Sequence, residues 1–428
     1  MKILEITGNK KLTGTIHIDG DKNSAVALIP AAILSDEKVT ITNVPNISDT
    51  SALEEILNFL NAKVEKSTNV LIIDSSNIEN KEIPVDVTKK LRASYYFMGA
   101  LLGKYKKVEM YFPGGCNIGS RPIDQHLKGF EALGATITEE DNKYTIVADE
   151  LVGANIKISM PGKGATTSVG ATINIMLAAV RAKGTTVIEN AAKEPQISNL
   201  ATFLNSMGAQ ITGAGTETIT IEGVDYLGTA HSEVIPDRIE AGTYLIAGAL
   251  VGENLNIEGL VPEHCEALLD TLETIGVPMT IGENNVIINS EEVYRSTNIK
   301  TVVYPGFVTD LQQPITTLLT QCTGVSEVVE TIYENRFQNV EFLIKMGAII
   351  AVDDRVPYKM KAKVVGPSKL KGTDVTATDL RAGASLVLAA LKAEGTTNIK
   401  DAEHILRGYA NIVQKLQDVG ANITIKEI

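Results

Sequence analysis

Residues 122–137, PIDQHLKGFEALGATI, hold the pattern that decides the fold. Apolar residues recur at roughly helical spacing through PIDQHLKGFEAL, which predicts an amphipathic helix. The glycine of Leu133-Gly-Ala-Thr-Ile137 can adopt the left-handed conformation that closes a last helical turn. The stretch therefore predicts a helix that stops at a glycine and turns into a strand.

This signature recurs at spacings of 68 to 74 residues, so that six units of about 72 residues fill the 428-residue chain. Each unit also holds a second helix that is apolar on nearly all sides and is therefore buried. A run rich in β-branched residues follows each buried helix. The signatures are Leu60–Val64, Leu133–Ile137, Met207–Ile211, Ile275–Met279, Met346–Ile350 and Val419–Ile423, and the buried helices begin near Asn23, Arg92, Ser168, Ile239, Asp310 and Leu380.

The unit expected from this order is β-α-β-α-β-β in an α/β protein. One unit cannot cover its own buried helix, so we expect three units to pack their buried helices together, with sheets outside. Six units then form two domains, residues 22–234 and residues 1–21 plus 235–428. An open solenoid is the alternative, although solenoid repeats are usually shorter, about 20–45 residues.

The composition limits the function classes. The chain is 44% hydrophobic with a net charge of −13, which favours large cores and argues against a broad nucleic-acid surface or a polybasic membrane anchor. Its 3 cysteines are too few and too scattered for a disulfide framework, and its 5 histidines show no metal-ligand spacing. The start resembles no signal peptide, and the apolar stretches are too short to span a bilayer. We expect a cytoplasmic protein without metal or cofactor.

Cations gather where helices are expected to begin, at positions that already carry a partial positive charge. Arginine there is adverse for the helix itself, so an anionic ligand is the interpretation favoured over salt bridges to neighbouring aspartates. These arginines are Arg92, Arg121, Arg238, Arg336, Arg381 and Arg407, and Lys22, Asp49, Asp310 and Asp379 lie at such starts too.

The loop Phe112-Pro-Gly-Gly-Cys-Asn-Ile-Gly-Ser-Arg-Pro122 is the sharpest local feature. Its glycines and prolines mark a defined turn, and Pro122 suits the first turn of a helix. A thiol beside Arg121 and helix N–H groups is expected to be acidic, which makes Cys116 a catalytic candidate. No dinucleotide-binding or P-loop glycine motif is present.

The chain resembles the UDP-N-acetylglucosamine 1-carboxyvinyltransferases, a family of enolpyruvyl transferases. The resemblance runs from end to end and implies an inside-out α/β barrel of two domains with three units each. It also implies transfer of the enolpyruvyl group of phosphoenolpyruvate to the 3-hydroxyl of UDP-N-acetylglucosamine, the first committed step of peptidoglycan precursor synthesis. The matching motifs are Gly20–Ser24, Leu91–Ser94, the Cys116 loop, Ser168–Thr172, Glu189–Pro195, Pro236–Glu240, Phe307–Leu311, Glu334–Phe337, Thr378–Ala382 and Arg407–Tyr409.

The resemblance implies a role for each matching residue. Asp310 is the candidate base and Cys116 the candidate acid, which in the family forms a phosphoenolpyruvate adduct and is alkylated by the epoxide fosfomycin. Phosphoenolpyruvate is expected to contact Lys22, Asn23, Arg121, Arg381 and Arg407, with Arg336 contributing to the anionic cleft. The nucleotide sugar is expected to contact Asn23, Arg92, Arg121, Pro122, Ile123, Asp124, Gln125, Ser168, Val169, Gly170, Asp310 and Ile332.

One position departs from the family. Many members carry Lys or Arg where this chain has Thr166, and we expect Lys163 to make that UDP contact instead. The facing cations of two empty domains are expected to repel, so that substrates favour closure with the Cys116 loop as a lid. The alternatives are the shikimate-pathway enolpyruvyl transferase, an RNA 3′-phosphate cyclase, which the acidic balance disfavours, and a catalytically idle paralogue that binds the nucleotide sugar.

Overall fold

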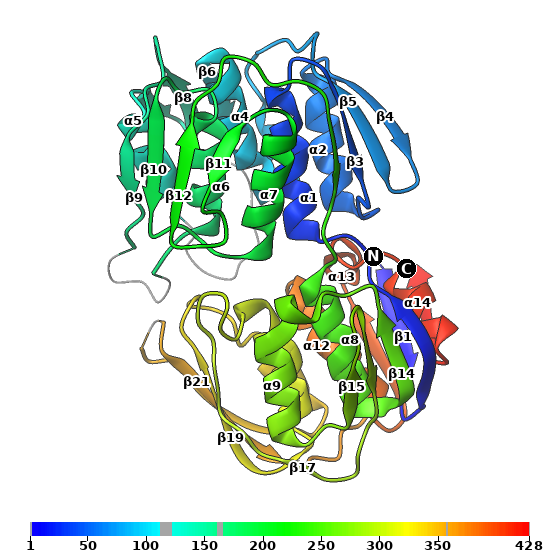
Figure 1. The fold of residues 1–428 in the computed structure, drawn as a ribbon. Helices are drawn as coiled ribbons and strands as arrows, with labels where there is room; N and C mark the ends of the chain where they lie inside the picture. The colour runs from blue at the N-terminus through cyan, green and yellow to red at the C-terminus, as the bar shows by residue number, and fades with distance from the viewer. Residues whose placement is uncertain (1, 112–121, 161–165, 357, 428) are drawn as a thin grey trace.

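A computed structural model describes residues 2–111, 122–160, 166–356 and 358–427 (Figure 1). Two lobes lie one above the other, and each has its own hydrophobic core. One core is built from buried residues between Ala25 and Val234. The other combines buried residues from Leu4 to Ile16 with those from Ile239 to Ile423.

Six buried helices form the centres of the lobes, as the sequence predicts. In the first lobe α4 packs against both α1 and α6, and in the second α8, α10 and α12 pack against one another. The contact of α4 with α6 is so close that a Cβ atom on Gly99 would lie 2.5 Å from the Asn174 carbonyl oxygen. The helices are α1 (Lys22–Ala31), α4 (Tyr96–Tyr105), α6 (Val169–Ala179), α8 (Arg238–Val251), α10 (Gln312–Leu319) and α12 (Leu380–Lys392).

Six amphipathic helices end at the repeated signature. Just past each one lies a residue with positive φ, which is Asn61 in the first unit and glycine in the other five. The predicted left-handed helix ends are therefore confirmed, because glycine and asparagine tolerate this conformation best. The helices are α2 (Ser48–Phe59), α5 (Asp124–Ala132), α7 (Pro195–Ser206), α9 (Glu266–Ile275), α11 (Val340–Lys345) and α14 (Ile412–Asp418).

Small sheets cover the outside of each lobe. In the first lobe their strand orders are β13-β3-β5-β4, β6-β8-β7 and β11-β12-β10-β9. These strands are β3 (Lys38–Thr42), β4 (Lys63–Ser67), β5 (Val70–Asp74), β6 (Lys107–Tyr111), β7 (Thr136–Glu140), β8 (Lys143–Val147), β9 (Asn155–Lys157), β10 (Thr185–Glu189), β11 (Gln210–Thr212), β12 (Thr218–Glu222) and β13 (Ala230–Glu233).

In the second lobe the orders are β15-β16-β14-β2, β17-β19-β21-β20 with β18 also beside β19, and β22-β23-β1-β24. These strands are β1 (Lys2–Thr7), β2 (Leu12–His17), β14 (Gly252–Glu258), β15 (Met279–Ile281), β16 (Asn285–Ile288), β17 (Tyr294–Arg295), β18 (Ile299–Lys300), β19 (Cys322–Glu330), β20 (Ile349–Asp353), β21 (Met360–Gly366), β22 (Asp374–Thr376), β23 (Thr396–Lys400) and β24 (Asn422–Glu427).

The first and last units borrow a strand from elsewhere in the chain. Strand β13, which follows the third unit, pairs in parallel with β3 of the first unit. Strand β1, at the N-terminus, lies between β23 and β24 of the sixth. Strand β13 thus joins the third unit to the first, and the chain from β1 to β2, which pairs with β14, joins the sixth unit to the fourth. Each lobe is a set of three units around its own core, so the open solenoid is excluded.

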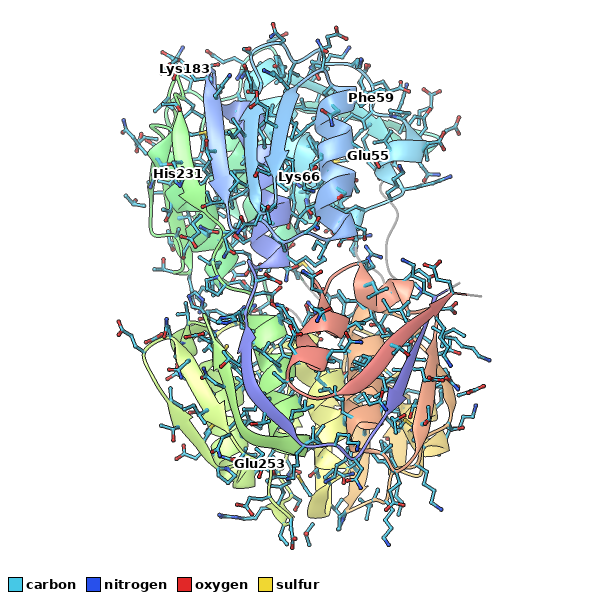
Figure 2. The ribbon with its side chains drawn as sticks, turned by 90° about the vertical axis from the view of Figure 1, so that its right-hand side faces the viewer. Glu55, Phe59, Lys66, Lys183, His231 and Glu253 are labelled. Atoms are coloured by element: carbon cyan, nitrogen blue, oxygen red, sulfur yellow. The ribbon has the colours of Figure 1, made fainter. Side chains whose placement is uncertain are left out.

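The chain crosses between the lobes twice, side by side. Asp21 donates its N–H to the Ile235 carbonyl at 2.6 Å, and Asp237 donates to the Asp19 carbonyl at 2.9 Å. Figure 2 shows the N-terminal segment running along the lower lobe, where Glu253 is labelled, before it enters the upper lobe of Lys183 and His231. The two crossings therefore form a short paired junction between the cores.

Candidate active site

A cavity of about 350 Å³ lies between the lobes and is lined by residues of both. The first residues of α1, α6, α8 and α12 all reach it. Helix N-termini present unpaired N–H groups and partial positive charge, so the cavity suits an anionic ligand. Residues singled out from the sequence that line it are Lys22, Asn23, Arg92, Pro122, Ser168, Val169, Gly170, Arg238, Asp310, Ile332, Arg336, Asp379, Arg381 and Arg407.

Asp310 lies on the second lobe between two arginines, in the short helix η4 (Thr309–Leu311) that leads into α10. Arg336 donates from Nη2 to Oδ1 of Asp310 at 2.6 Å, and Arg381 donates from Nη2 to Oδ2 at 3.2 Å. Burial raises the pKa of Asp310, but the charges and hydrogen bonds of Arg381 and Arg336 outweigh it and hold that pKa well below its usual range. Asp310 is therefore ionised and only weakly basic while both arginines hold it.

Asp49 is a second carboxylate that is paired with two cations. It is the second residue of α2, and only 3% of its side chain is exposed. Lys22 Nζ lies 2.9 Å from its Oδ2, and Arg407 donates to its Oδ1 from Nη2 at 3.1 Å and from Nε at 3.2 Å. Because Arg407 belongs to the second lobe, this group joins the two lobes. The expected repulsion between facing cations is thus offset by Asp49.

The helix-start prediction holds for several cations and is wrong for two, Arg407 and Arg336, of which Arg336 lies in no helix and precedes α11. Lys22 and Arg238 are the first residues of α1 and α8, and Arg381 is the second residue of α12. Arg407 instead follows the last residue of the short helix α13 (Glu403–Leu406). A cation there complements the negative end of the helix dipole, so the helix itself favours this arginine.

The cavity also has a polar wall to which the sequence assigned no role. Glu194 and Gln196 line it with 9% and 5% exposure. Burial raises the pKa of Glu194, an effect that the charge of Arg238 opposes. The Arg238 guanidinium lies 5.0 Å from the centre of the Tyr304 ring. Glu194 belongs to the Glu189–Pro195 motif, and this motif is the sequence feature that could have identified Glu194 as a site residue.

Some predicted site residues lie elsewhere or outside the described residues. Ile123, Asp124 and Gln125 follow Pro122 but do not line the cavity, and Gln125 instead accepts from the Ser159 N–H at 3.0 Å. Thr166 lies next to the cavity residue Thr167 and accepts a hydrogen bond from Asn190 at 2.6 Å. Cys116, Arg121 and Lys163 lie outside the described residues.

Within the described residues, no group of three His, Cys, Asp or Glu side chains could hold a metal ion. No helix of that part of the chain combines the length and the apolar character needed to cross a membrane.

Comparison with known proteins defines the class of this chain. Residues 6–416 match the model of the family described as EPSP synthase (3-phosphoshikimate 1-carboxyvinyltransferase). The enolpyruvyl transferase NikO of Streptomyces tendae has a similar structure, with a TM-score of 0.90 and 27% identity over 99% of both chains. An EPSP synthase of Acinetobacter baumannii, 16% identical with a TM-score of 0.74 over 100% of both chains, shares the fold. The class is that of the enolpyruvyl, or carboxyvinyl, transferases.

Curated relatives narrow the class. UDP-N-acetylglucosamine 1-carboxyvinyltransferase 2 of Listeria monocytogenes is 52% identical over 98% of this chain and 97% of its own length. The protein of the same name in Geobacillus kaustophilus is 50% identical over 99% of this chain and 96% of its own length. The chain belongs to the family of UDP-N-acetylglucosamine 1-carboxyvinyltransferases, as its motifs predict.

Proposed function

We propose that this protein transfers the enolpyruvyl group of phosphoenolpyruvate to the 3-hydroxyl of UDP-N-acetylglucosamine and releases phosphate. The observation that carries the proposal is the cavity between the lobes, where Asp310 lies among cations drawn from both. The product is the first committed intermediate of peptidoglycan precursor synthesis, which links the protein to cell-wall biogenesis, cell shape and division.

The reaction is an addition followed by an elimination. The sugar oxygen bonds to C2 of phosphoenolpyruvate as its proton passes to a base, and an acid protonates the C3 methylene. Loss of a C3 proton then reforms the double bond as the C2–O bond to phosphate breaks. Lys22, Arg121, Arg381 and Arg407 hold the carboxylate and phosphate, with Asn23 beside them and Arg336 in the same cleft.

Asp310 is the base in this scheme, and its arginines explain how it becomes one. Arg336 and Arg381 hold its pKa low in the unliganded site. An arriving carboxylate or phosphate competes for the same N–H groups, which releases the Asp310 oxygens. Its pKa then rises toward the ordinary range, so that phosphoenolpyruvate binding activates the base.

The nucleotide sugar occupies the rest of the cavity. Ser168 caps α6 by accepting from the Ala171 N–H at 3.2 Å, which fixes the α6 N-terminus beside the cavity for an anionic diphosphate. Within the cavity, the remaining contacts are proposed for Asn23, Arg92, Pro122, Val169, Gly170 and Ile332. Arg121, and Ile123, Asp124 and Gln125, which do not line the cavity, are proposed to contact the nucleotide sugar from the segment around Pro122, and Lys163 takes the basic position before the Ser168 motif.

Cys116 is proposed as the acid that protonates C3. The same thiol forms the covalent phosphoenolpyruvate adduct and is the target of fosfomycin, whose epoxide carbon it attacks. Cys116→Asp keeps a proton donor but removes the nucleophile. The variant should therefore release phosphate and show no fosfomycin mass shift, whereas loss of activity would assign the thiol another role.

The deciding experiment is a phosphate-release assay. Purified protein is incubated with phosphoenolpyruvate plus either UDP-N-acetylglucosamine or shikimate 3-phosphate. Release only with the nucleotide sugar is expected. Release with shikimate 3-phosphate would instead favour the shikimate-pathway enzyme, and no release with either would favour an idle paralogue that binds the sugar nucleotide.

The lobes are proposed as two domains, residues 22–234 and residues 1–21 plus 235–428, that close on the substrates with the Cys116 loop as a lid. Their separate cores and paired crossings support this division. The protein is proposed to be cytoplasmic, where both substrates are soluble metabolites, with no nucleic-acid or membrane partner.

A further inference from the structure

Lys22 and Arg407, the proposed clamp for phosphoenolpyruvate, share one carboxylate. Asp49 receives Lys22 Nζ at 2.9 Å on one oxygen and Arg407 Nη2 at 3.1 Å on the other. Asp49 itself is not among the residues that line the cavity, so it does not touch the substrate in the proposed reaction. Its place behind two cavity residues suggests that it acts through them.

We propose that Asp49 is a positioning residue that holds Lys22 and Arg407 in the arrangement that binds phosphoenolpyruvate. This inference rests on the proposed function. A lysine and an arginine side by side repel each other, and both are flexible side chains. A shared carboxylate that is 3% exposed removes the repulsion and restricts both side chains.

The backbone contacts strengthen this inference. Asp49 lies in the first turn of α2, where a carboxylate is favoured by the helix dipole. Lys22 begins α1 directly after the crossing, and its N–H donates to Asp237 Oδ2 at 3.1 Å. Lys22 is thus fixed at its backbone by the second lobe and at its ammonium by Asp49. Arg407 completes the group from the second lobe, so the clamp forms only when the lobes lie together.

The chain offers a matched control. Asp36 is also held by a lysine and an arginine, with Lys104 Nζ at 3.5 Å and Arg181 Nη2 at 2.5 Å. All three belong to the first lobe and none of them lines the cavity. Asp36→Asn therefore removes the same kind of charge without touching the clamp, and its effect is confined to stability.

The test compares Asp49→Asn with Asp36→Asn and the wild type in the phosphate-release assay. For Asp49→Asn we expect the KM for phosphoenolpyruvate to rise roughly ten- to a hundred-fold, as loss of one charged partner does, while the KM for UDP-N-acetylglucosamine changes less than about two-fold. Asp36→Asn should leave both KM values unchanged. Melting temperatures should be measured with and without phosphoenolpyruvate. Asp49→Asn should fold, but its melting temperature should rise less on addition of phosphoenolpyruvate than that of the wild type.

Each result decides the inference. An unchanged or lower KM for phosphoenolpyruvate in folded Asp49→Asn would overturn it, as would an equal rise in both KM values. If Asp49→Asn does not fold, Asp49→Glu keeps the charge and must recover folding together with a raised KM for phosphoenolpyruvate alone. If the wild type itself releases no phosphate, the proposed function fails. A smaller thermal shift with phosphoenolpyruvate in Asp49→Asn would then still support the anion-binding role of the group.

Discussion

The basicity of Asp310 depends on its two arginine partners. Arg336 and Arg381 are 2% and 6% exposed, so their charges act on Asp310 with little screening by solvent. They suppress its basicity, and in the proposed reaction they hold the substrate anion instead. In that proposal the same two arginines make base activity depend on occupancy of the anion site.

Asp310→Asn tests this residue in the proposed reaction. The amide keeps the shape of the side chain and its oxygen can still accept from one of the two arginines, but its NH2 group cannot accept from the other and the side chain cannot take a proton. We expect kcat to fall by about 10²- to 10⁴-fold, the usual contribution of a general base. Phosphate release measures it, and Asp353→Asn, which breaks an exposed pair with Arg355, is the control. A loss smaller than ten-fold would mean that another group accepts the proton.

At the scale of the helix, the repeated signature makes a prediction about stability. Gly276 and Gly347 both end helices of the second lobe, with φ of 95° and 107°. A Cβ atom on Gly276 would meet no atom closer than 3.8 Å, whereas one on Gly347 would lie 2.8 Å from the Lys369 carbonyl oxygen. Gly276→Ala should therefore cost about 1 kcal/mol from the left-handed backbone alone. Gly347→Ala should cost more because the backbone must also move.

Urea denaturation checks this order. The urea midpoint should fall from the wild type to Gly276→Ala and fall again to Gly347→Ala. Ala384→Gly is the control, because glycine in the interior of α12 is expected to lower the midpoint. Equal midpoints for the two glycine variants would show that the neighbouring carbonyl yields without cost.

Elements could be predicted from the sequence because their signals are local. The buried helix expected to begin near Ser168 is observed as Val169–Ala179, and the β run expected after the buried helix that begins near Arg92 is observed as Lys107–Tyr111. The pairing of charges could not be predicted, because Asp49 and Arg407 lie 358 residues apart. The helix before Arg407 is only four residues long, too short for a periodic signal, and this is why that arginine was placed at a helix start.

For the whole molecule, substrate binding should change the distance between the lobes. The proposed cavity takes residues from both, so a ligand that contacts each favours the closed arrangement. We expect small-angle scattering to give a smaller radius of gyration with UDP-N-acetylglucosamine than without it. Shikimate 3-phosphate, the substrate of the alternative function, is the control and should cause no change. An identical radius with and without the nucleotide sugar would contradict closure.

The junction between the lobes should make stability depend on pH through Asp21. Burial, followed by the charge of Asp237, raises the pKa of Asp21, and Arg238 and the N–H of Ser24 oppose this only in part. A carboxyl whose pKa is higher in the folded than in the unfolded protein binds more protons when folded. Its contribution therefore favours folding at low pH and is lost as pH rises from about 4 toward neutrality.

Asp21→Asn removes this dependence while an amide oxygen can still cap α1 in place of the carboxylate that accepts from Ser24. At about pH 3.5 Asp21 is protonated in both the folded and the unfolded wild type, so the variant and the wild type should melt at similar temperatures. At pH 8 the wild type must bury a charge beside Asp237, so the variant should melt several degrees higher. Melting curves across this range measure the difference. A variant less stable than the wild type at pH 8 would mean that Arg238 and Lys22 outweigh burial, and that the junction favours the charged carboxylate.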